Sequence, residues 1–254
     1  MQLIDTHCHL DFDDFSDDRQ QLMVRAQALG VAHFVVPAVQ QGTWQSLLTL
    51  FQQQQCVHLA LGMHPLFMAE HKESHIALLD TVLQQQRPIA VGEIGLDFYS
   101  AETDRQMQLH FFRAQLQLAA KHKLPVILHV RKAHDEVLKC LREIPVMAGI
   151  VHAFNGSMQQ AEHYVAMNFK LGFGGMLTYP RSTKLRTLAG CLSLDALVLE
   201  TDSPDMTVMQ HRGQRNSPEY LPYCLQALAE LRGQSQEIIA EVTSANARQV
   251  LGIK

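Results

Sequence analysis

Short runs of β-branched and aliphatic residues recur along the whole chain, and more polar stretches separate them. The runs are apolar at nearly every position, which is typical of strands in a parallel sheet that is buried on both faces. We expect strands from eight such runs, which begin at Leu3, Ala32, Cys56, Pro88, Pro125, Gly149, Phe169 and Ala196.

The stretches between these runs have the amphipathic spacing of helices. We expect helices over residues 17–29, 43–53, 75–86, 104–122, 133–142, 158–167 and 183–191. Two further helices are predicted near the C-terminus, because Ser235 and the pair Ser217 and Pro218 are residue types that begin helices.

The alternation of eight strands with helices over 254 residues predicts an α/β fold, a (β/α)8 TIM barrel. A doubly wound sheet more often stops at about five to seven strands. No linker rich in Pro or Ser divides the sequence, so we expect residues 1–254 to form a single domain. The turns after the strands carry no Gly-x-Gly-x-x-Gly motif and no Gly-Lys-Ser/Thr loop, so we expect no nucleotide cofactor.

Composition narrows the class of protein. Apolar residues make up 47% of the chain and charged residues 18%, which excludes a disordered chain. The sequence has no signal-like N-terminal segment and no run of about 18 apolar residues, so we expect no membrane partner. The five cysteines are widely spaced without any Cys-x-x-Cys, which favours a cytoplasmic protein over a disulfide framework. We expect a monomer, although no residue pattern specifies the oligomeric state.

The net charge is −4, from 21 Lys and Arg against 25 Asp and Glu. This balance excludes binding to DNA through bulk positive charge, so any contact with phosphates must be local. Basic residues follow the fifth, seventh and eighth predicted strands, and the candidates for substrate contact are Arg131, Arg181, Lys184, Arg186 and Arg212. Each could equally serve solubility, and the acidic group between Asp11 and Asp18 argues against a phosphate-binding surface.

Histidines gather where the predicted strands end. In a (β/α)8 barrel the reactive groups lie at the C-terminal ends of the strands and in the loops that follow them. Five of the fourteen histidines occupy or follow such ends, namely His7, His9, His64, His129 and His152. His33 and His58 lie instead near the beginnings of strands, where we expect polar residues to serve stability.

Spacing by two places Asp5, His7 and His9 on one face of a strand, with the histidines about 6.6 Å apart along it. Both imidazoles could bind one metal ion, or they could form a hydrogen-bonded pair in the core. Glu93 lies within an apolar strand, where an ionised carboxylate needs a partner ion. A metal is the natural partner, and Arg131 is the alternative.

The remaining candidates are ambiguous one at a time. His129 and His152 each follow an apolar strand, as core histidines also do. Asp202 follows the eighth strand two residues after Glu200, where an Asp before Ser-Pro can also cap a turn. Together the candidates supply six nitrogen or oxygen ligands, too many for one tetrahedral ion and enough for two: His7, His9, Glu93, His129, His152 and Asp202.

Six motifs, in order along the chain, resemble those of the TatD family of metal-dependent hydrolases and DNases, within the amidohydrolase-like barrels. They are DTHCHLD at residues 5–11, GMHP at 62–65, GEIGLDF at 92–98, HVR at 129–131, HAFNGS at 152–157 and ETDSP at 200–204. The resemblance covers essentially the whole chain and implies a barrel with two divalent metal ions.

The resemblance also implies a role for each candidate ligand. His7 and His9 would bind the first ion, and Glu93 would bridge the two ions. His129 and His152 would bind the second ion. Asp202 would complete the site beside a bridging water.

Two divalent ions that share a water lower its pKa and can neutralise charge on both oxygens of a phosphodiester. Asp202 is then the expected base, Glu93 the bridge, and His64 the donor of a hydrogen bond to a phosphoryl oxygen. Zn, Mn, Mg, Co and Ni all stay open as the metal. The predicted activity is that of a deoxyribonuclease with a nucleic acid as substrate. Hydrolysis of a small ester, amide or aminoacyl ester is the alternative, and a metal-stabilised binding barrel is the non-enzymatic one.

Overall fold

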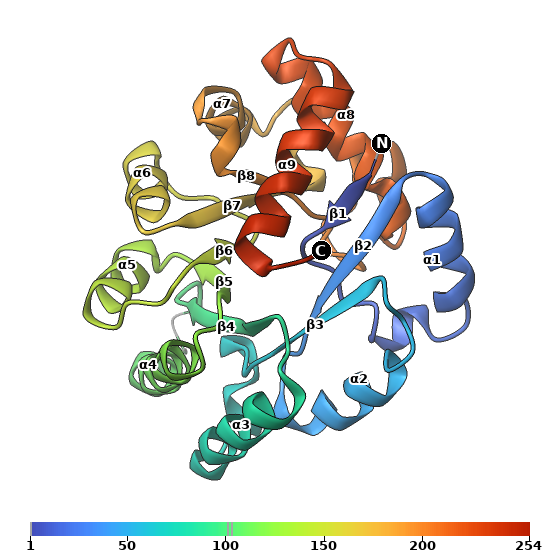
Figure 1. Cartoon of the computed structure of the whole chain (residues 1–254). Helices are drawn as coiled ribbons and strands as arrows, with labels where there is room; N and C mark the ends of the chain where they lie inside the picture. The colour runs from blue at the N-terminus through green and yellow to red at the C-terminus, as the bar shows by residue number, and fades with distance from the viewer. Residues whose placement is uncertain (1, 101, 103) are drawn as a thin grey trace. The chain divides into compact units, whose positions relative to one another are not determined.

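Strands and helices alternate along the chain (Figure 1), in a computed structural model that describes residues 2–100, 102 and 104–254. The strands are β1 (Leu3–Asp5), β2 (Val31–Pro37), β3 (Val57–Leu61), β4 (Ala90–Asp97), β5 (Val126–Arg131), β6 (Gly149–Val151), β7 (Phe169–Phe173) and β8 (Leu197–Leu199). The helices are α1 (Arg19–Ala28), α2 (Trp44–Leu50), α3 (Glu73–Gln86), α4 (Arg105–His122), α5 (His134–Glu143), α6 (Met158–Ala166), α7 (Thr183–Cys191), α8 (Leu221–Arg232) and α9 (Gln236–Leu251).

The strands are neighbours in chain order within one eight-stranded sheet. The pairs β1–β2, β3–β4, β4–β5, β5–β6 and β7–β8 are parallel. Directly after β1, the backbone N–H of Thr6 donates to the carbonyl of Leu199 at the end of β8 (3.1 Å), so the last strand is bonded to the first. The predicted (β/α)8 barrel is confirmed.

The expected helices are present, and those predicted with both ends differ from the observed bounds by at most three residues. Ser235 caps α9 by accepting a hydrogen bond from the backbone N–H of Ile238 (3.4 Å). Ser217 instead caps a short 3-10 helix, η7 (Pro218–Tyr220), which precedes α8. Its hydroxyl accepts from the backbone N–H of Glu219 (3.2 Å). Serine and proline therefore begin a helical turn here, as predicted, one turn before the α-helix proper.

The residues of the chain form two compact units, each built from separate stretches. The first unit comprises Met1–Val36, Gln54–His58 and Lys170–Lys254, and the second comprises Pro37–Gln53 and Leu59–Phe169. The single domain expected over residues 1–254 stays a prediction.

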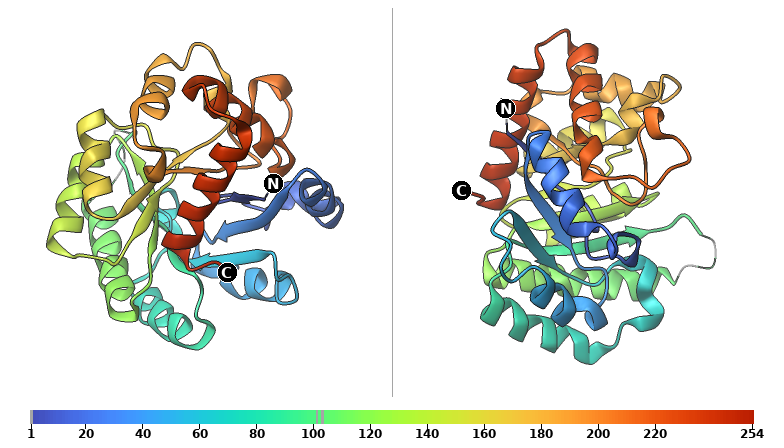
Figure 2. Two further views of the ribbon diagram at one scale, coloured as in Figure 1. Left: turned by 45° about the horizontal axis from the view of Figure 1, so that its top comes forward. Right: turned by 90° about the vertical axis from the view of Figure 1, so that its right-hand side faces the viewer.

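In the first unit, α9 packs against β1 and β8, and α8 packs beside α9, as the red helices of Figure 2 show. The amide of Asn246 in α9 donates to the carbonyls of Leu194 (2.9 Å) and Leu197 (2.7 Å). Asn246 is buried, and it satisfies backbone carbonyls at the start of β8 that would otherwise lack partners.

In the second unit, α4 packs against β4, all eight residues of which are buried. Two buried glutamines of α4 bind backbone groups beyond or within the neighbouring strands. Gln108 accepts from the N–H of Asp97 (2.8 Å) and donates to the carbonyl of Pro65 (3.1 Å). Gln115 accepts from the N–H of Met63 (2.7 Å) and donates to its carbonyl (3.1 Å). These amides fix the backbone at the C-terminal ends of β3 and β4.

Three strands, β1, β6 and β8, are shorter than the apolar runs that predicted them, and each spans three residues. His7, His9 and Asp202 therefore lie beyond the strand ends. The prediction that Asp5, His7 and His9 share one face of a strand was wrong, because the strand ends at Asp5. At the ends of β1 and β8 the backbone is bonded to Asp5, which is fully buried at the end of β1. Its carboxylate accepts the backbone N–H groups of His7 (3.3 Å) and Thr201 (3.0 Å), so side-chain bonds organise the segments after these strands.

All five cysteines lie among the described residues, and none of them is disulfide-bonded. Within the described part of the chain, every helix is too short or too polar to cross a membrane.

Candidate metal-binding site

His7, His9 and Asp202 form a compact group in the first unit. The Nε2 atoms of the two histidines are 3.3 Å apart, and each lies 3.7 Å from Oδ1 of Asp202. Two ligands at about 2.1 Å from a tetrahedral ion are separated by roughly 3.4 Å, so the three atoms have the spacing of ligands to one ion. A hydrogen bond between the two imidazoles, the alternative considered from the sequence, fits the same short distance.

Backbone hydrogen bonds join the two segments that carry this group. The N–H of Asp202 donates to the carbonyl of His7 (2.8 Å), and the N–H of His9 donates to the carbonyl of Ser203 (2.8 Å). Asp202 itself has a φ of 57°, a left-handed conformation that is uncommon for a residue with a side chain. Observed strain of this kind is common at functional sites, where the surrounding structure enforces it.

The carboxylate of Asp5 is hydrogen-bonded to both segments that carry this group. Its second oxygen accepts a hydrogen bond of 2.6 Å from the hydroxyl of Thr201. Burial raises the pKa of Asp5 to about 7, against the hydrogen bonds from Thr201 and His7, which lower it. Because Asp5 is bonded both to His7 and to Thr201, it positions the loops that carry His7 and Asp202.

A second group of candidate ligands lies in the second unit, around the buried carboxylate of Glu93. Its Oε1 lies 3.2 Å from Nδ1 of His129 and 3.2 Å from Nε2 of His64. His152, which follows β6, also has a ring nitrogen within 4.8 Å of a carboxylate oxygen of Glu93. Arg131, the alternative partner considered for Glu93, places its guanidinium over the ring of Tyr99.

The two nitrogens of His129 face different carboxylates. Nε2 lies 2.9 Å from Oδ2 of Asp97, and Nδ1 faces Glu93. Burial opposes charge on both Asp97 and His129, but several hydrogen bonds and neighbouring charges together outweigh it. The bonds from His129 and from the N–H of Tyr99 lower the pKa of Asp97, and the bonds to Asp97 and Glu93 raise the pKa of His129. With its hydrogen on Nε2, neutral His129 keeps a lone pair on Nδ1 for an ion, as in carboxylate–histidine–metal arrangements.

Asp97 was not among the residues predicted for the site. It lies in β4 four residues after Glu93, so the two carboxylates project to the same side of the strand. The signal was therefore a second acidic residue in phase with Glu93 within an apolar strand. What the sequence does not show is its partner, which comes from the neighbouring strand β5 in the register Asp97 to Arg131.

His64 is oriented differently from the other histidines of the second unit. Its Nδ1 accepts a hydrogen bond from the backbone N–H of Leu66 (3.1 Å). A neutral imidazole that accepts at Nδ1 carries its hydrogen on Nε2, and this N–H points at Oε1 of Glu93. Burial lowers the pKa of His64, against the opposing effect of Glu93, which favours this neutral form. The tautomer suits a hydrogen-bond donor, because a ligand through Nε2 would need that nitrogen unprotonated.

Four of the five basic residues predicted to contact substrate are exposed, namely Arg131, Arg181, Lys184 and Arg212. Arg186 is half-buried, and its Nη1 donates to the carbonyl of Leu177. Leu177 belongs to η4 (Gly175–Thr178), directly after β7. Arg186 therefore ties α7 to the segment before it, which is a structural role that the sequence did not reveal.

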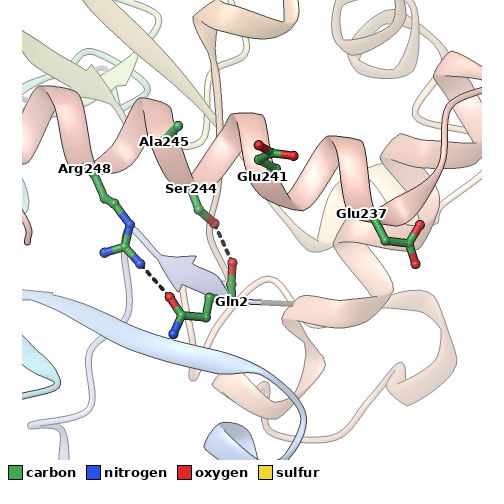
Figure 3. A pocket seen from close by; sticks show the side chains of 6 residues that line it. All are labelled: Gln2, Glu237, Glu241, Ser244, Ala245 and Arg248. Atoms are coloured by element: carbon green, nitrogen blue, oxygen red, sulfur yellow. Dashed lines mark hydrogen bonds between the residues drawn. The ribbon is translucent and has the colours of Figure 1, made fainter.

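The first unit also has a groove whose lining includes none of the candidate ligands (Figure 3). Its lining comes from α9 and the residue before β1, and consists of Gln2, Glu237, Glu241, Ser244, Ala245 and Arg248. Gln2 accepts hydrogen bonds from Ser244 (2.9 Å) and Arg248 (3.0 Å). The groove lies at the N-terminal end of β1, the end of a barrel strand where conserved polar groups serve stability and not catalysis.

Known proteins match this chain over nearly its whole length. The model of the family described as "TatD related DNase" matches residues 4–252. An uncharacterised metal-dependent hydrolase of Escherichia coli K12, YjjV, is 39% identical over 249 residues, which cover 96% of each chain. A protein of Erwinia billingiae named "3'-5' ssDNA/RNA exonuclease TatD" is 33% identical over 258 residues, which cover 98% of each. The crystal structure of YjjV superposes with a TM-score of 0.95 at 37% identity, covering 99% of this chain and 98% of that one.

Proposed function

Because this chain belongs to the TatD family of metal-dependent hydrolases, we propose that it cleaves phosphodiester bonds in single-stranded nucleic acid, using two divalent metal ions. The names of the Erwinia relatives, which are given as single-stranded DNA and RNA exonucleases, support the choice of substrate. Other relatives, among them YjjV, are described only as metal-dependent hydrolases, so a small ester or amide is the competing substrate.

The observation that carries the proposal is the position of His129 between Asp97 and Glu93. Oriented imidazoles and ionised carboxylates are the donor set that Zn and other first-row transition metals prefer, whereas Mg favours oxygen ligands alone. In the proposal His7, His9 and Asp202 would hold one ion, and His129 and His152 would hold the other. Glu93 would be the ligand shared by the two ions. When bound, the ions lower the pKa of water and neutralise charge on the phosphodiester oxygens.

The chain's own groups supply the remaining steps. Asp202 has an exposed fraction of 17% on its side chain, enough to meet a water, and takes the proton of the attacking water. His64 directs its Nε2–H into the group around Glu93 and donates to a phosphoryl oxygen as negative charge develops there. Both roles use polar groups whose positions the backbone fixes before substrate binds, through the bonds from Leu66 and to His7.

The test is a substrate panel with defined metals. The protein is stripped with a chelator, reloaded separately with Zn, Mn, Mg, Co or Ni, and assayed on end-labelled single-stranded DNA, RNA, duplex DNA, and a set of esters and amides. We expect cleavage of the single strands, and a loss of about 10² or more in turnover for Asp202→Asn, the usual scale for removing a general base. Hydrolysis of an ester or amide with no cleavage of nucleic acid would replace the proposal by the small-molecule hydrolase.

A further inference from the structure

We propose that Tyr99, with Arg131 and Lys132, forms a stacking surface for one base of a single-stranded substrate, here called the cationic–aromatic ledge. The inference rests on the proposed function and names the part of the substrate that this segment recognises. None of the three residues belongs to the groups of candidate ligands.

The ledge combines an exposed ring with two cations. The guanidinium carbon of Arg131 lies 3.7 Å from the centre of the Tyr99 ring, and the Lys132 ammonium lies 4.6 Å from it. Despite these neighbours Tyr99 keeps 56% of its surface exposed, and both cations are exposed as well. Proteins that bind single strands combine these two features, because aromatic and guanidinium planes stack on bases while positive charge follows the phosphates.

The backbone under the ledge is fixed by two strands. The N–H of Phe98 donates to the carbonyl of Arg131 (2.9 Å), which continues the β4–β5 pairing one residue past the end of β4. The N–H of Tyr99 donates to Oδ1 of Asp97 (3.0 Å). Lys132 has a φ of 53°, so the chain turns at this residue in a left-handed conformation that a non-glycine residue seldom adopts. Arg131 is therefore positioned by the sheet, and Tyr99 is held just beyond the sheet by the bond of its N–H to Asp97.

Asp97 connects the ledge to the candidate metal ligands. Its Oδ1 accepts from the backbone of Tyr99, while its Oδ2 accepts from Nε2 of His129. One carboxylate thus fixes both a candidate ligand and the residue that carries the exposed ring. Tyr99 is only two residues from Asp97, about 7 Å along an extended chain, so a base on its ring belongs to a nucleotide close to the cleaved bond.

A substrate without bases would leave the ledge unused, and this property gives the test. Binding of the metal-loaded protein is measured by fluorescence anisotropy with a labelled single strand whose phosphorothioate linkages resist cleavage, and with the same strand made abasic. The variants are Tyr99→Ala, Tyr99→Leu and Tyr99→Phe. Lys139→Ala, which removes an exposed lysine paired with Glu136 on α5, is the control for a change that does not involve the ledge.

We expect Tyr99→Ala and Tyr99→Leu to weaken binding of the normal strand by about 5- to 150-fold, the range of one base–aromatic stack. Tyr99→Phe keeps the ring, so its affinity should stay within about twofold of the wild type on the same grounds. The abasic strand should lose less than about twofold with any of these variants, because it offers no base to stack. In steady-state cleavage the effect should appear in KM, since stacking away from the reacting bond binds substrate and transition state equally.

The outcomes separate the ledge from the function on which it rests. Equal losses on normal and abasic strands, equal affinities for Tyr99→Ala and wild type, or no binding of the strand by the wild type would each overturn the ledge. Tight binding of the strand without hydrolysis of any phosphodiester under any metal would overturn the proposed nuclease and leave a binding surface. Cleavage of nucleic acid that is insensitive to Tyr99 would keep the nuclease and remove the ledge.

Discussion

Nε2 of His129 lies 2.9 Å from Oδ2 of Asp97, and this contact determines which nitrogen of the histidine faces Glu93. A carboxylate that accepts from one imidazole nitrogen fixes the tautomer and raises the basicity of the other nitrogen. Asp97 is buried, at 2% exposure, so its charge is compensated mainly by this histidine and by the N–H of Tyr99. The tautomer of the candidate ligand His129 and the position of the exposed tyrosine therefore depend on the same side chain.

Replacing Asp97 by Asn should reduce metal affinity by about 10- to 100-fold, the usual effect of removing a carboxylate partner of a ligating histidine. The amide keeps the size of the side chain and can still accept one hydrogen bond, so the fold should persist. Metal affinity is measured by competition with a chromophoric chelator. Asp80→Asn is the control. Asp80 on α3 pairs with Lys121 and His122 on α4, so its replacement should leave the metal affinity unchanged. An Asp97→Asn protein with wild-type affinity would mean that His129 is not a ligand.

The metal stoichiometry should be two ions per chain, and in crystals grown with excess Zn or Mn the ions should lie about 3.5 to 4 Å apart with Glu93 and a water as bridges. His9→Ala and His152→Ala should each lower the metal content by about one equivalent, because each removes a ligand from one of the two proposed sets. Metal content is determined by mass spectrometry of the dialysed protein. A single ion in the wild-type protein, or ions remote from Glu93, would contradict the two-metal hypothesis.

Much of the fold followed from the sequence because strands that are buried on both faces are apolar at nearly every position. The eight runs mark such strands, and β4, with all eight residues buried, is the clearest case. The strand ends were less predictable, since β1 and β8 stop where the carboxylate of Asp5 takes over backbone N–H groups. One of these N–H groups belongs to Thr201, which is 196 residues from Asp5 in the sequence, so no local pattern could predict the bond.

The candidate ligands were predictable because polar residues at the ends of apolar strands are costly unless they bind something. Their supporting residues were not. Asp97 acquires its role from the register of β4 against β5, and Arg186 acquires its own from the carbonyl of Leu177. Local spacing identifies residue types that can do chemistry, whereas the contacts that orient them are formed between strands and turns that only the fold brings together.

His33 and His58 should affect acid stability and not metal content. Nε2 of His58 lies 3.1 Å from Nδ1 of His33, and burial lowers the pKa of His58 to about 4, helped by His33 and Arg248. Since the unfolded chain binds this proton near pH 6.5 and the folded chain only near pH 4, the contribution of neutral His58 is fully present above pH 6.5 and is lost as the pH falls toward 4.

His58→Gln should therefore lose less stability than the wild type between those two pH values, with the urea midpoint of unfolding as the measurement. His163→Gln, a change at an exposed histidine of α6, serves as the control. A parallel pH dependence in the His58→Gln and wild-type proteins would show that His58 has no role in acid stability. Loss of metal in His58→Gln would mean that this end of the barrel participates in the metal site.

The salt dependence of binding distinguishes a nucleic acid from a neutral ester, because only neutralised phosphates release counterions. With so few basic residues near the strand ends, we expect about two to four phosphates engaged and a slope of log K against log salt of roughly −1.5 to −3 on single strands.

Arg181 and Lys184 are better targets than Arg186, whose replacement would also remove its bond to Leu177. Replacing both by Ala should make the slope shallower by about 1.4, the effect of two lost phosphate contacts. Lys139→Ala with Arg142→Ala on α5 removes the same charge from exposed positions later in a helix, and should leave the slope as it is. If both double variants change the slope equally, net charge alone accounts for the dependence; if neither does, the segment after β7 does not contact phosphates.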